Sequence, residues 1–352
     1  MLKIKKKIMK IVLRTISVML NIKKDIEKTM KKTHLIILSL FLTSAIIITA
    51  TVITYKALTV PKSKKYVVET IEANSKGYIK VGIISDAQLP QEEKNLYGWD
   101  YATVMNGADH LIKALKYYKS QNVDMIVFNG DMVNATGDYA AYSAYNKILD
   151  YVYGEDRAEA PHIIYPMGNH EFYGGNQEHN FYKSTGLPLN TRTIVNGYSF
   201  ISISNSKLEK GDEELAESND TLADGTYNEK RIEFLKEQLA AANTEDPNKP
   251  IFVFIHMPIS NIVNGGHWAT PQYEEIYSIL KEYPQAVVFT GHSHYCMSDE
   301  RAIMQKDFTV INTGTTSYFD FDWLDNEDEN EANDFPADIS QKKSCLSKSG
   351  TT

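Results

Sequence analysis

The stretch Asp124–Asn134, DMIVFNGDMVN, decides which fold this 352-residue chain is expected to adopt. It begins with a short run of apolar residues, which is typical of a strand covered on both faces of a sheet. Gly130 and Asp131 end that run, and Asn134 follows. Ligand groups in open α/β sheets collect just beyond the carboxyl ends of strands, and Asp131 occupies such a place. The stretch therefore predicts a sheet with a polar site at its edge.

Polar blocks follow apolar runs at four other places. These blocks are Asp86-Ala-Gln88, Gly168-Asn169-His170-Glu171, His256-Met-Pro258 and Gly291-His292-Ser-His294. Strands are expected at Tyr78–Ser85, Asp124–Asn129, His162–Pro166, Ser199–Ser204, Ile251–Ile255, Gln285–Phe289 and Phe308–Asn312, and helices at Tyr101–Ser120, Tyr139–Tyr153 and Asn228–Ala242. Because strands alternate with helices of ten or more residues, the pattern indicates an α/β protein. The segments Glu171–Asn196 and Lys207–Thr226 lack clear periodicity and are expected to form loops near the site.

The blocks share oxygen and nitrogen donors that suit hard or borderline divalent ions. Seven donors stand in this order along the chain: Asp86, Gln88, Asp131, Asn169, His256, His292 and His294. Alone, Asp86 is explained as a cap, Asn169 as a turn residue and His256 as a half-buried histidine. Their common position at strand ends favours a site for two ions, about 3.5–4 Å apart and bridged by one carboxylate, which polarises a phosphoryl group and activates water.

Composition sets limits on the class of protein. Hydrophobic residues make up 43% of the chain and charged residues 23%, as in a folded globular protein. The net charge is −8, yet the first 34 residues carry eleven Lys or Arg against Asp25 and Glu27, which leaves −17 for the rest. An acidic body argues against binding to a nucleic-acid backbone, so no nucleic-acid partner is expected. Two cysteines without C-x-x-C spacing give no thiolate metal site.

The N-terminal region reads as a membrane segment. Residues 35–55 contain no charged residue, and about 20 apolar residues span a bilayer. The basic extension 1–34 precedes them, so the positive-inside rule places the N-terminus in the cytoplasm and the body outside the cell membrane. A cleaved signal, which would give a secreted protein, and a buried core helix are the alternatives. Because Met30 begins an ordinary export leader, residues 1–29 are interpreted as an upstream extension.

The ordered blocks resemble the calcineurin-like metallophosphoesterase superfamily, whose pattern is D-x-H, G-D-x-x-[DN], G-N-H-[DE], a lone His, and G-H-x-H. The resemblance runs from about Ile79 to Tyr318. It implies a four-layer α/β/β/α sandwich with a dinuclear metal site at its edge. It also implies that Asp86, Gln88, Asp131 and His294 hold one ion, and that Asp131, Asn169, His256 and His292 hold the other. His170 is implied as the catalytic residue, which contacts the substrate oxygen or protonates the leaving group.

Two residues depart from the family pattern. Gln88 stands where the family usually has His, and a neutral carboxamide oxygen favours Mn²⁺ or Mg²⁺ over Zn²⁺ or Fe³⁺. Asn134 replaces the Asp that, in the protein-phosphatase branch, orients the catalytic His, so His170 gains no charge-assisted partner from that side chain. The resemblance is therefore to the general superfamily. It implies hydrolysis of small phosphate esters, with phosphodiesters or nucleotides favoured, by a metal-activated hydroxide.

The substrate-binding side chains are less well indicated. Asn169, His170, Arg192 and His267 are candidates, together with a stacking role for Trp268 beside His267. Alternatives to the phosphodiesterase are a non-catalytic binding protein that keeps the fold, a phosphomonoesterase and a protein phosphatase. The predicted organisation is a basic extension (1–34), a membrane or signal-anchor segment (35–55), a linker (56–77), the catalytic domain (78–319) and an acidic, disordered tail (320–352). The oligomeric state has no signal in the sequence.

Overall fold

The computed structural model describes residues 65–74, 77–89, 101–134, 139–172, 177–206, 225–259, 262–264 and 269–319. All of them belong to one compact unit, Ser63–Thr352. None of the helices in these ranges is long and apolar enough to span a bilayer. The predicted extension (1–34), membrane segment (35–55) and acidic tail (320–352) lie outside the described residues and stay predictions.

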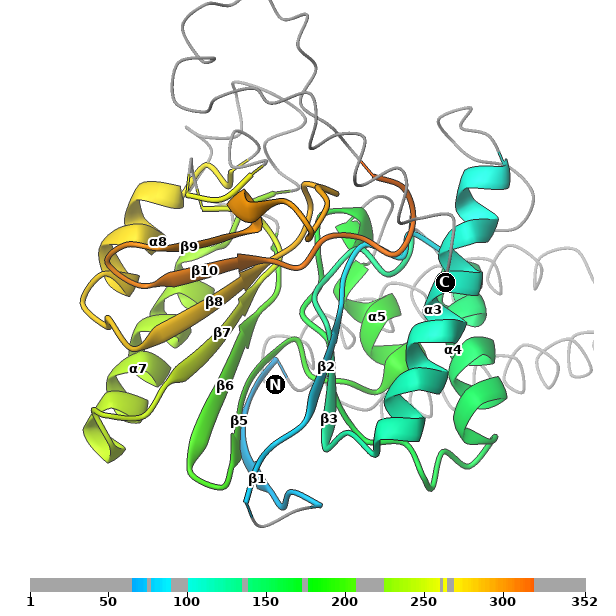
Figure 1. The fold of residues 1–352 in the computed structure, drawn as a ribbon, viewed down its shortest axis with the longest axis horizontal. Coiled ribbons are helices and arrows are strands. Elements are labelled where there is room, and N and C mark those ends of the chain that lie inside the picture. Colours follow the sequence, from blue (N-terminus) through cyan, green and yellow to red (C-terminus); the bar gives the residue numbers. More distant parts are fainter. Residues whose placement is uncertain are drawn as a thin grey trace, which may run out of the picture. The chain divides into compact units, whose positions relative to one another are not determined.

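Two sheets form the centre of this unit (Figure 1). The small sheet consists of three parallel strands in the order β2 (Val81–Ile84), β3 (Met125–Phe128) and β4 (His162–Ile164). The large sheet has the order β1-β5-β6-β7-β8-β10-β9. Its strands are β1 (Tyr66–Ile71), β5 (Asn190–Val195), β6 (Tyr198–Ile203), β7 (Ile251–Ile255), β8 (Ala286–Thr290), β9 (Ile303–Gln305) and β10 (Thr309–Asn312). Strands β6, β7, β8 and β10 run parallel, so their carboxyl ends lie at one edge.

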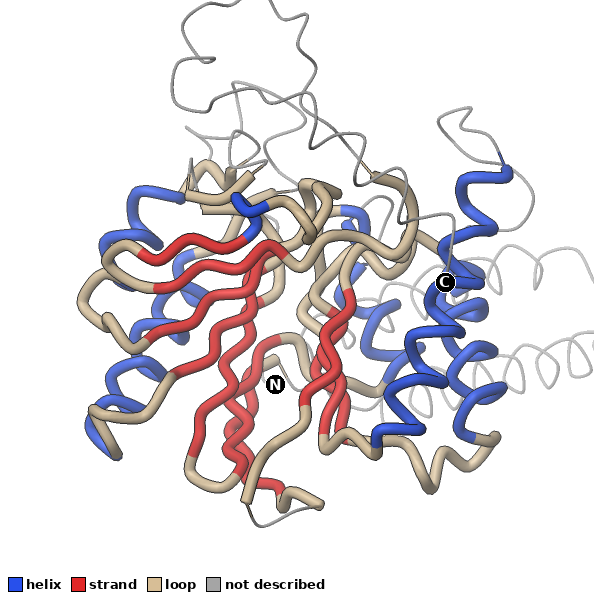
Figure 2. The backbone as a smooth tube through the Cα atoms, viewed as in Figure 1, coloured by secondary structure: helices blue, strands red, loops and turns tan. Residues whose placement is uncertain are grey.

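Alternation along the strands produces three hydrophobic cores and therefore four layers. In β3, Met125 and Val127 pack toward Phe200 and Phe254 of the large sheet, whereas Ile126 and Phe128 belong to a separate core under helices. In Figure 2, one group of helices covers the outer face of the small sheet and another covers the large sheet. The expected α/β/β/α arrangement is thus seen in the described residues.

The helices divide between the two outer faces. Helices α3 (Tyr101–Gln121), α4 (Tyr139–Tyr153) and α5 (Gln177–Thr185) accompany the small sheet, and α7 (Glu229–Glu245) and α8 (Tyr273–Leu280) accompany the large one. Helix α7 starts where the Asn228 side chain accepts a hydrogen bond from the Arg231 N–H at 3.2 Å, which is N-capping. Its buried residues Ile232, Leu235 and Leu239 recur at helical spacing and pack on the large sheet.

The structure differs from the sequence-based expectation in two segments. Residues Tyr66–Ile71, assigned to a linker, form the edge strand β1, which pairs with β5. The segment Glu171–Asn196, expected to be a loop, contains the single-turn helix η1 (His170–Phe172), helix α5 and strand β5. Both errors arise because these elements are short, so that pairing with distant residues rather than local periodicity stabilises them.

Candidate metal centre

The predicted donors lie where the carboxyl edges of the two sheets meet. Asp86 follows β2, Asp131 follows β3, His256 follows β7 and His292 follows β8. Asn129 joins the edges: its side-chain amide donates to the Phe289 carbonyl at 3.2 Å, and its own carbonyl accepts from His256 Nδ1 at 2.7 Å. The site therefore spans the seam between the small and the large sheet.

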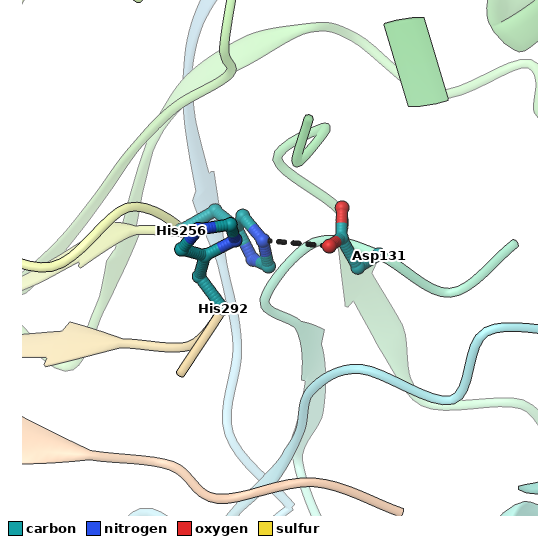
Figure 3. Close-up of side chains that lie close together, drawn as sticks. All are labelled: Asp131, His256 and His292. Atoms are coloured by element: carbon teal, nitrogen blue, oxygen red, sulfur yellow. Dashed lines mark ion pairs between the residues drawn. The ribbon is translucent and has the colours of Figure 1, made fainter. Parts of the chain in front are cut away.

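One compact group holds three of the donors (Figure 3). Each of Asp131, His256 and His292 offers a ligand atom, and these atoms all lie within 4.8 Å of one another. The Asp131 Oδ2 and His256 Nε2 atoms are 3.0 Å apart, and both side chains are buried. A carboxylate from the small sheet thus meets imidazoles from the large sheet.

A second set of donors adjoins the first. The Asp86 Oδ1 atom lies 3.2 Å from His294 Nε2 and 3.9 Å from His256 Nε2. Gln88 Nε2 lies 3.1 Å from His294 Nε2. The His292 backbone N–H points at the Asp86 carboxylate, 3.1 and 3.2 Å from its two oxygens. The structure therefore brings these predicted ligands beside the three-residue group.

Asn169 and His170 complete the assembly from beyond β4. The His170 N–H donates to Asp131 Oδ1 at 2.8 Å, which fixes this turn to the carboxylate. The His170 Nε2 atom lies 3.4 Å from Gln88 Nε2 and 3.9 Å from Asp131 Oδ2. Asn169, which is buried, precedes His170 directly. All seven predicted ligands and the predicted catalytic histidine thus come from loops at the same seam.

Backbone carbonyls set the tautomer of three histidines. The Nδ1 atoms of His256, His294 and His170 lie 2.7, 3.0 and 2.7 Å from the carbonyl oxygens of Asn129, Tyr318 and Asn134. Because a carbonyl only accepts, each Nδ1 carries a hydrogen, and the Nε2 of the neutral ring keeps its lone pair. This is the arrangement that holds metal-ligating histidines in place.

The role of Asn134 follows from the same contacts. The carboxylate expected from the protein-phosphatase pattern is absent, as the sequence predicts. The His170 ring is nevertheless held, because the Asn134 main chain supplies the acceptor. Any residue at this position provides that carbonyl, so the substitution removes a charge without removing the orienting hydrogen bond.

The backbone is left-handed at five of the seven predicted ligands. Five have positive φ: Asp86 (54°), Gln88 (44°), Asp131 (53°), His292 (67°) and His294 (56°). Within the described ranges only eight non-glycine residues have this conformation. A left-handed L-residue costs about 1–2 kcal/mol, and such strain is typical of functional sites. Strain is therefore concentrated on the donors themselves.

Buried atoms at the centre fit a divalent cation. Neither Asp131 Oδ2 nor His256 Nε2 makes a hydrogen bond of good geometry, although both are shielded from solvent. An unsatisfied buried polar atom costs about 1–3 kcal/mol, which a cation in contact with both atoms would offset. The oxygen and nitrogen donors suit a hard or borderline ion. The residues present therefore fit the metal that the sequence predicts.

In the absence of metal, the pKa values of Asp131 and His256 are shifted by their mutual interaction. Burial lowers the pKa of His256, but the carboxylates of Asp131 and Asp86 outweigh it and raise that pKa to about 10. Burial raises the pKa of Asp131, and the positive charges of His256 and His170 more than offset this, so its net shift is downward. Burial and the charge on His256 lower the pKa of His292 to about 3. A proton on His256 thus occupies the place that a cation would take.

This proton makes the stability of the metal-free protein dependent on pH. The folded pKa of His256, about 10, exceeds its ordinary value of 6.5. A raised pKa stabilises the fold below the unfolded value, and that stabilisation is lost as the pH rises through the folded value. We expect the free energy of unfolding of metal-free protein to fall by on the order of 2 kcal/mol between about pH 7 and 10. Denaturant titrations in chelator measure it; a slope that persists in His256→Gln would contradict this origin.

Glu171 is a site residue to which the sequence analysis gave no role. Its buried carboxylate accepts hydrogen bonds from the backbone N–H groups of Asp131 (2.9 Å), Met132 (2.9 Å), Val133 (3.4 Å) and Gly168 (2.7 Å), and from the Tyr165 hydroxyl (2.7 Å). Burial and the charge of Asp131 raise its pKa to about 7, against the lowering effect of these hydrogen bonds. Glu171 therefore ties the loop after β3 to the loop after β4. The sequence offered one indication of this role, namely that Glu171 belongs to the Gly168–Glu171 block.

One candidate substrate-binding residue does not join the site. Arg192 is buried on β5, where its Nε donates to Ser199 Oγ at 3.0 Å and its Nη2 lies 2.5 Å from Glu245 Oε2. Its guanidinium is thus engaged in a structural ion pair with α7, and the structure does not bring it to the donors. The expectation failed because a charged residue in an unpatterned segment was taken for a loop residue. His267 lies outside the described residues.

The fold and the donors define a metal-binding α/β/β/α protein, and sequence comparison supplies its family. A profile described as "Calcineurin-like phosphoesterase" matches residues 79–296, and the chain belongs to this family. Curated protein sequences contain no match to the chain.

Three solved structures are similar to the chain at low identity. One is a dimetal phosphatase from Danio rerio, with 17% identity, a TM-score of 0.49, and coverage of 68% of this chain and 88% of that chain. Another is a protein from Thermus thermophilus, with 14% identity, a TM-score of 0.43, and coverage of 68% and 91%. A third is a cold-active protein-tyrosine phosphatase from a psychrophilic Shewanella species, with 14% identity, a TM-score of 0.26, and coverage of 72% and 75%.

Proposed function

We propose that the protein hydrolyses small phosphate esters with the help of two divalent cations. The observation that carries the proposal is the buried contact between Asp131 Oδ2 and His256 Nε2, 3.0 Å apart, with further donors on both sides. The pair stands among five donors with left-handed backbone, and strain of this kind is typical of functional sites. Membership of the phosphoesterase family supports the reaction type.

The family resemblance assigns the residues that would hold the ions. Asp86, Gln88, Asp131 and His294 would hold the first ion, and Asp131, Asn169, His256 and His292 the second. When bound, the two ions supply positive charge to the phosphoryl oxygens and lower the pKa of a bound water. The carboxamide of Gln88 favours Mn²⁺ as the metal, with Mg²⁺, Fe and Zn²⁺ as alternatives.

His170 is proposed as the proton donor to the leaving oxygen. Its side chain retains 18% of its exposure, whereas those of Asp131 and His256 retain 1% and 0%. The ring thus reaches the solvent side of the donors while Asn134 holds its Nδ1. A protonated Nε2 would donate to an oxygen placed there, and the Asp131 Oδ2 atom lies 3.9 Å from it.

The proposed substrates are phosphodiesters or nucleotides ahead of monoesters. Support comes from position 134, where the orienting group is a neutral carbonyl and not the carboxylate of the protein-phosphatase pattern. The extracytoplasmic, membrane-anchored location predicted from residues 35–55 is kept as part of the proposal, because it limits the substrates to those outside the cytoplasm.

Hydrolysis assays test the proposed function. Metal-free protein is reconstituted with Mn²⁺, Mg²⁺ or Zn²⁺ and assayed with bis-p-nitrophenyl phosphate, p-nitrophenyl phosphate and a nucleotide panel. We expect turnover of the diester with Mn²⁺, loss of turnover with chelator, and weaker turnover of the monoester. A folded, metal-loaded protein that hydrolyses none of these compounds would favour the non-catalytic alternative.

A further inference from the structure

The segment Thr313–Tyr318, here called the strap, follows β10 and crosses the loop that carries Asp86. It is anchored at its start, where the N–H and hydroxyl of Thr313 donate to the Thr290 carbonyl at the end of β8, at 2.7 and 2.8 Å. Gly314 turns the chain with φ of 67°. The strap thus leaves the large sheet and reaches a loop of the small sheet.

Two hydroxyl groups of the strap hold the Asp86 backbone. Thr315 Oγ1 and Ser317 Oγ both donate to the Asp86 carbonyl, at 3.0 and 2.8 Å. The Thr316 N–H donates to the neighbouring Ser85 carbonyl at 3.2 Å. Asp86 has φ of 54°, so its conformation is costly unless surrounding contacts determine it. The hydroxyl groups provide contacts of that kind.

Tyr318 holds the His294 ring in two ways. Its carbonyl accepts from His294 Nδ1 at 3.0 Å, which leaves Nε2 as the ligand atom. Its own ring packs on the imidazole with centroids 4.2 Å apart at an interplanar angle of 34°. The tautomer and the plane of His294 are therefore both determined by one residue of the strap.

Helix α3 covers the other side of the strap. His110 Nδ1 lies 2.8 Å from the Thr316 carbonyl oxygen. A Cβ atom at Gly107 would lie 3.5 Å from the Ser317 Cβ atom. The strap is thus clamped between α3 and the loop of Asp86.

We propose that the strap is a positioning element for the first ion, with Thr315, Ser317 and Tyr318 as its positioning residues. The inference rests on the proposed function only in requiring that two ions bind. Its direct hydrogen bonds to ligands go to Asp86 and His294, which belong to the first ion. Weakening the strap therefore lowers affinity for one ion and spares the ion held by Asp131, Asn169, His256 and His292.

Calorimetric titration of Mn²⁺ into the full chain tests this proposal. The variants are Thr315→Val/Ser317→Ala and Tyr318→Leu. The matched control is Thr191→Val/Ser202→Ala, which removes a buried hydroxyl pair, 2.9 Å apart, between β5 and β6. We expect each strap variant to bind one ion at least about 10-fold more weakly and the other within about 2-fold of the wild type, and the control to bind both normally.

Equal weakening of both ions, or unchanged affinities in both strap variants, would overturn the strap proposal while the proposed function stands. A wild type that binds fewer than two ions would overturn both.

Discussion

Asp131→Asn should lower kcat/KM for a phosphodiester by roughly 10³-fold, which corresponds to about 4 kcal/mol of transition-state stabilisation. The Asp131 Oδ2 atom lies 3.0 Å from His256 Nε2 and 3.9 Å from His170 Nε2. Its negative charge therefore acts on both a predicted metal ligand and the predicted catalytic residue. An amide presents one oxygen and one N–H₂ group and carries no negative charge, so it would be a weaker ligand for two cations than the carboxylate. Steady-state kinetics at saturating Mn²⁺, with metal content measured on the same sample, checks the prediction.

Asp124→Asn is the matched control for this substitution. Asp124 precedes β3 as Asp131 follows it, and its buried carboxylate accepts hydrogen bonds from the backbone N–H groups of Asn74 and Lys80, the latter at 2.6 Å. We expect Asp124→Asn to lower the melting temperature and to keep kcat/KM within about 3-fold, because it lies at the opposite end of the strand. Equal losses of activity in both variants would show that Asp131 acts through stability alone.

The sequence was most informative where local pattern and site coincide. The residues Ile251–Ile255 and Tyr139–Tyr153 form a strand and a helix with the predicted bounds, because the first is a continuous apolar run and the second has apolar residues at helical spacing. The donors after Phe128 and Ile255 could each be placed at a carboxyl edge, because parallel strands bring their carboxyl ends to one edge of their own sheet. The sequence pattern therefore predicted the carboxyl edges of the two sheets and the donors that lie on them.

The contacts that hold the donors in place could not be predicted from the sequence pattern. The backbone carbonyls of Asn129, Asn134 and Tyr318 orient three histidines. Because every residue has a backbone carbonyl, the residue type does not reveal this role. The ion pair of Arg192 with Glu245 joins residues 53 positions apart, so no local window contains both. Left-handed φ angles at Asp86 and His294 are equally invisible, since glycine is the residue expected there.

The second large effect is expected from Glu171→Gln, which should lower the free energy of unfolding. In Glu171→Gln an N–H₂ group replaces one carboxylate oxygen, and either orientation of the amide opposes N–H donors. The Oε2 atom accepts from the N–H groups of Asp131 and Gly168, and the Oε1 atom from Met132, Val133 and the Tyr165 hydroxyl. At least two buried donors then lack an acceptor, which costs about 1–3 kcal/mol each. We expect metal-free Glu171→Gln to lose about 3–4 kcal/mol of unfolding free energy in urea.

The same substitution separates support of the site from ordinary packing. Because two of the donors are the N–H groups of Asp131 and Gly168, a lost acceptor displaces the loops that carry Asp131 and Asn169. We therefore expect Mn²⁺ affinity to fall about 10-fold or more, the loss found when groups behind a metal ligand are removed. Glu159→Gln is the control, since its side chain is 73% exposed and its ion pair with Lys119 adds less than about 1 kcal/mol. A Glu171→Gln protein within about 1 kcal/mol of that control would show that the five hydrogen bonds are not what holds the two loops together.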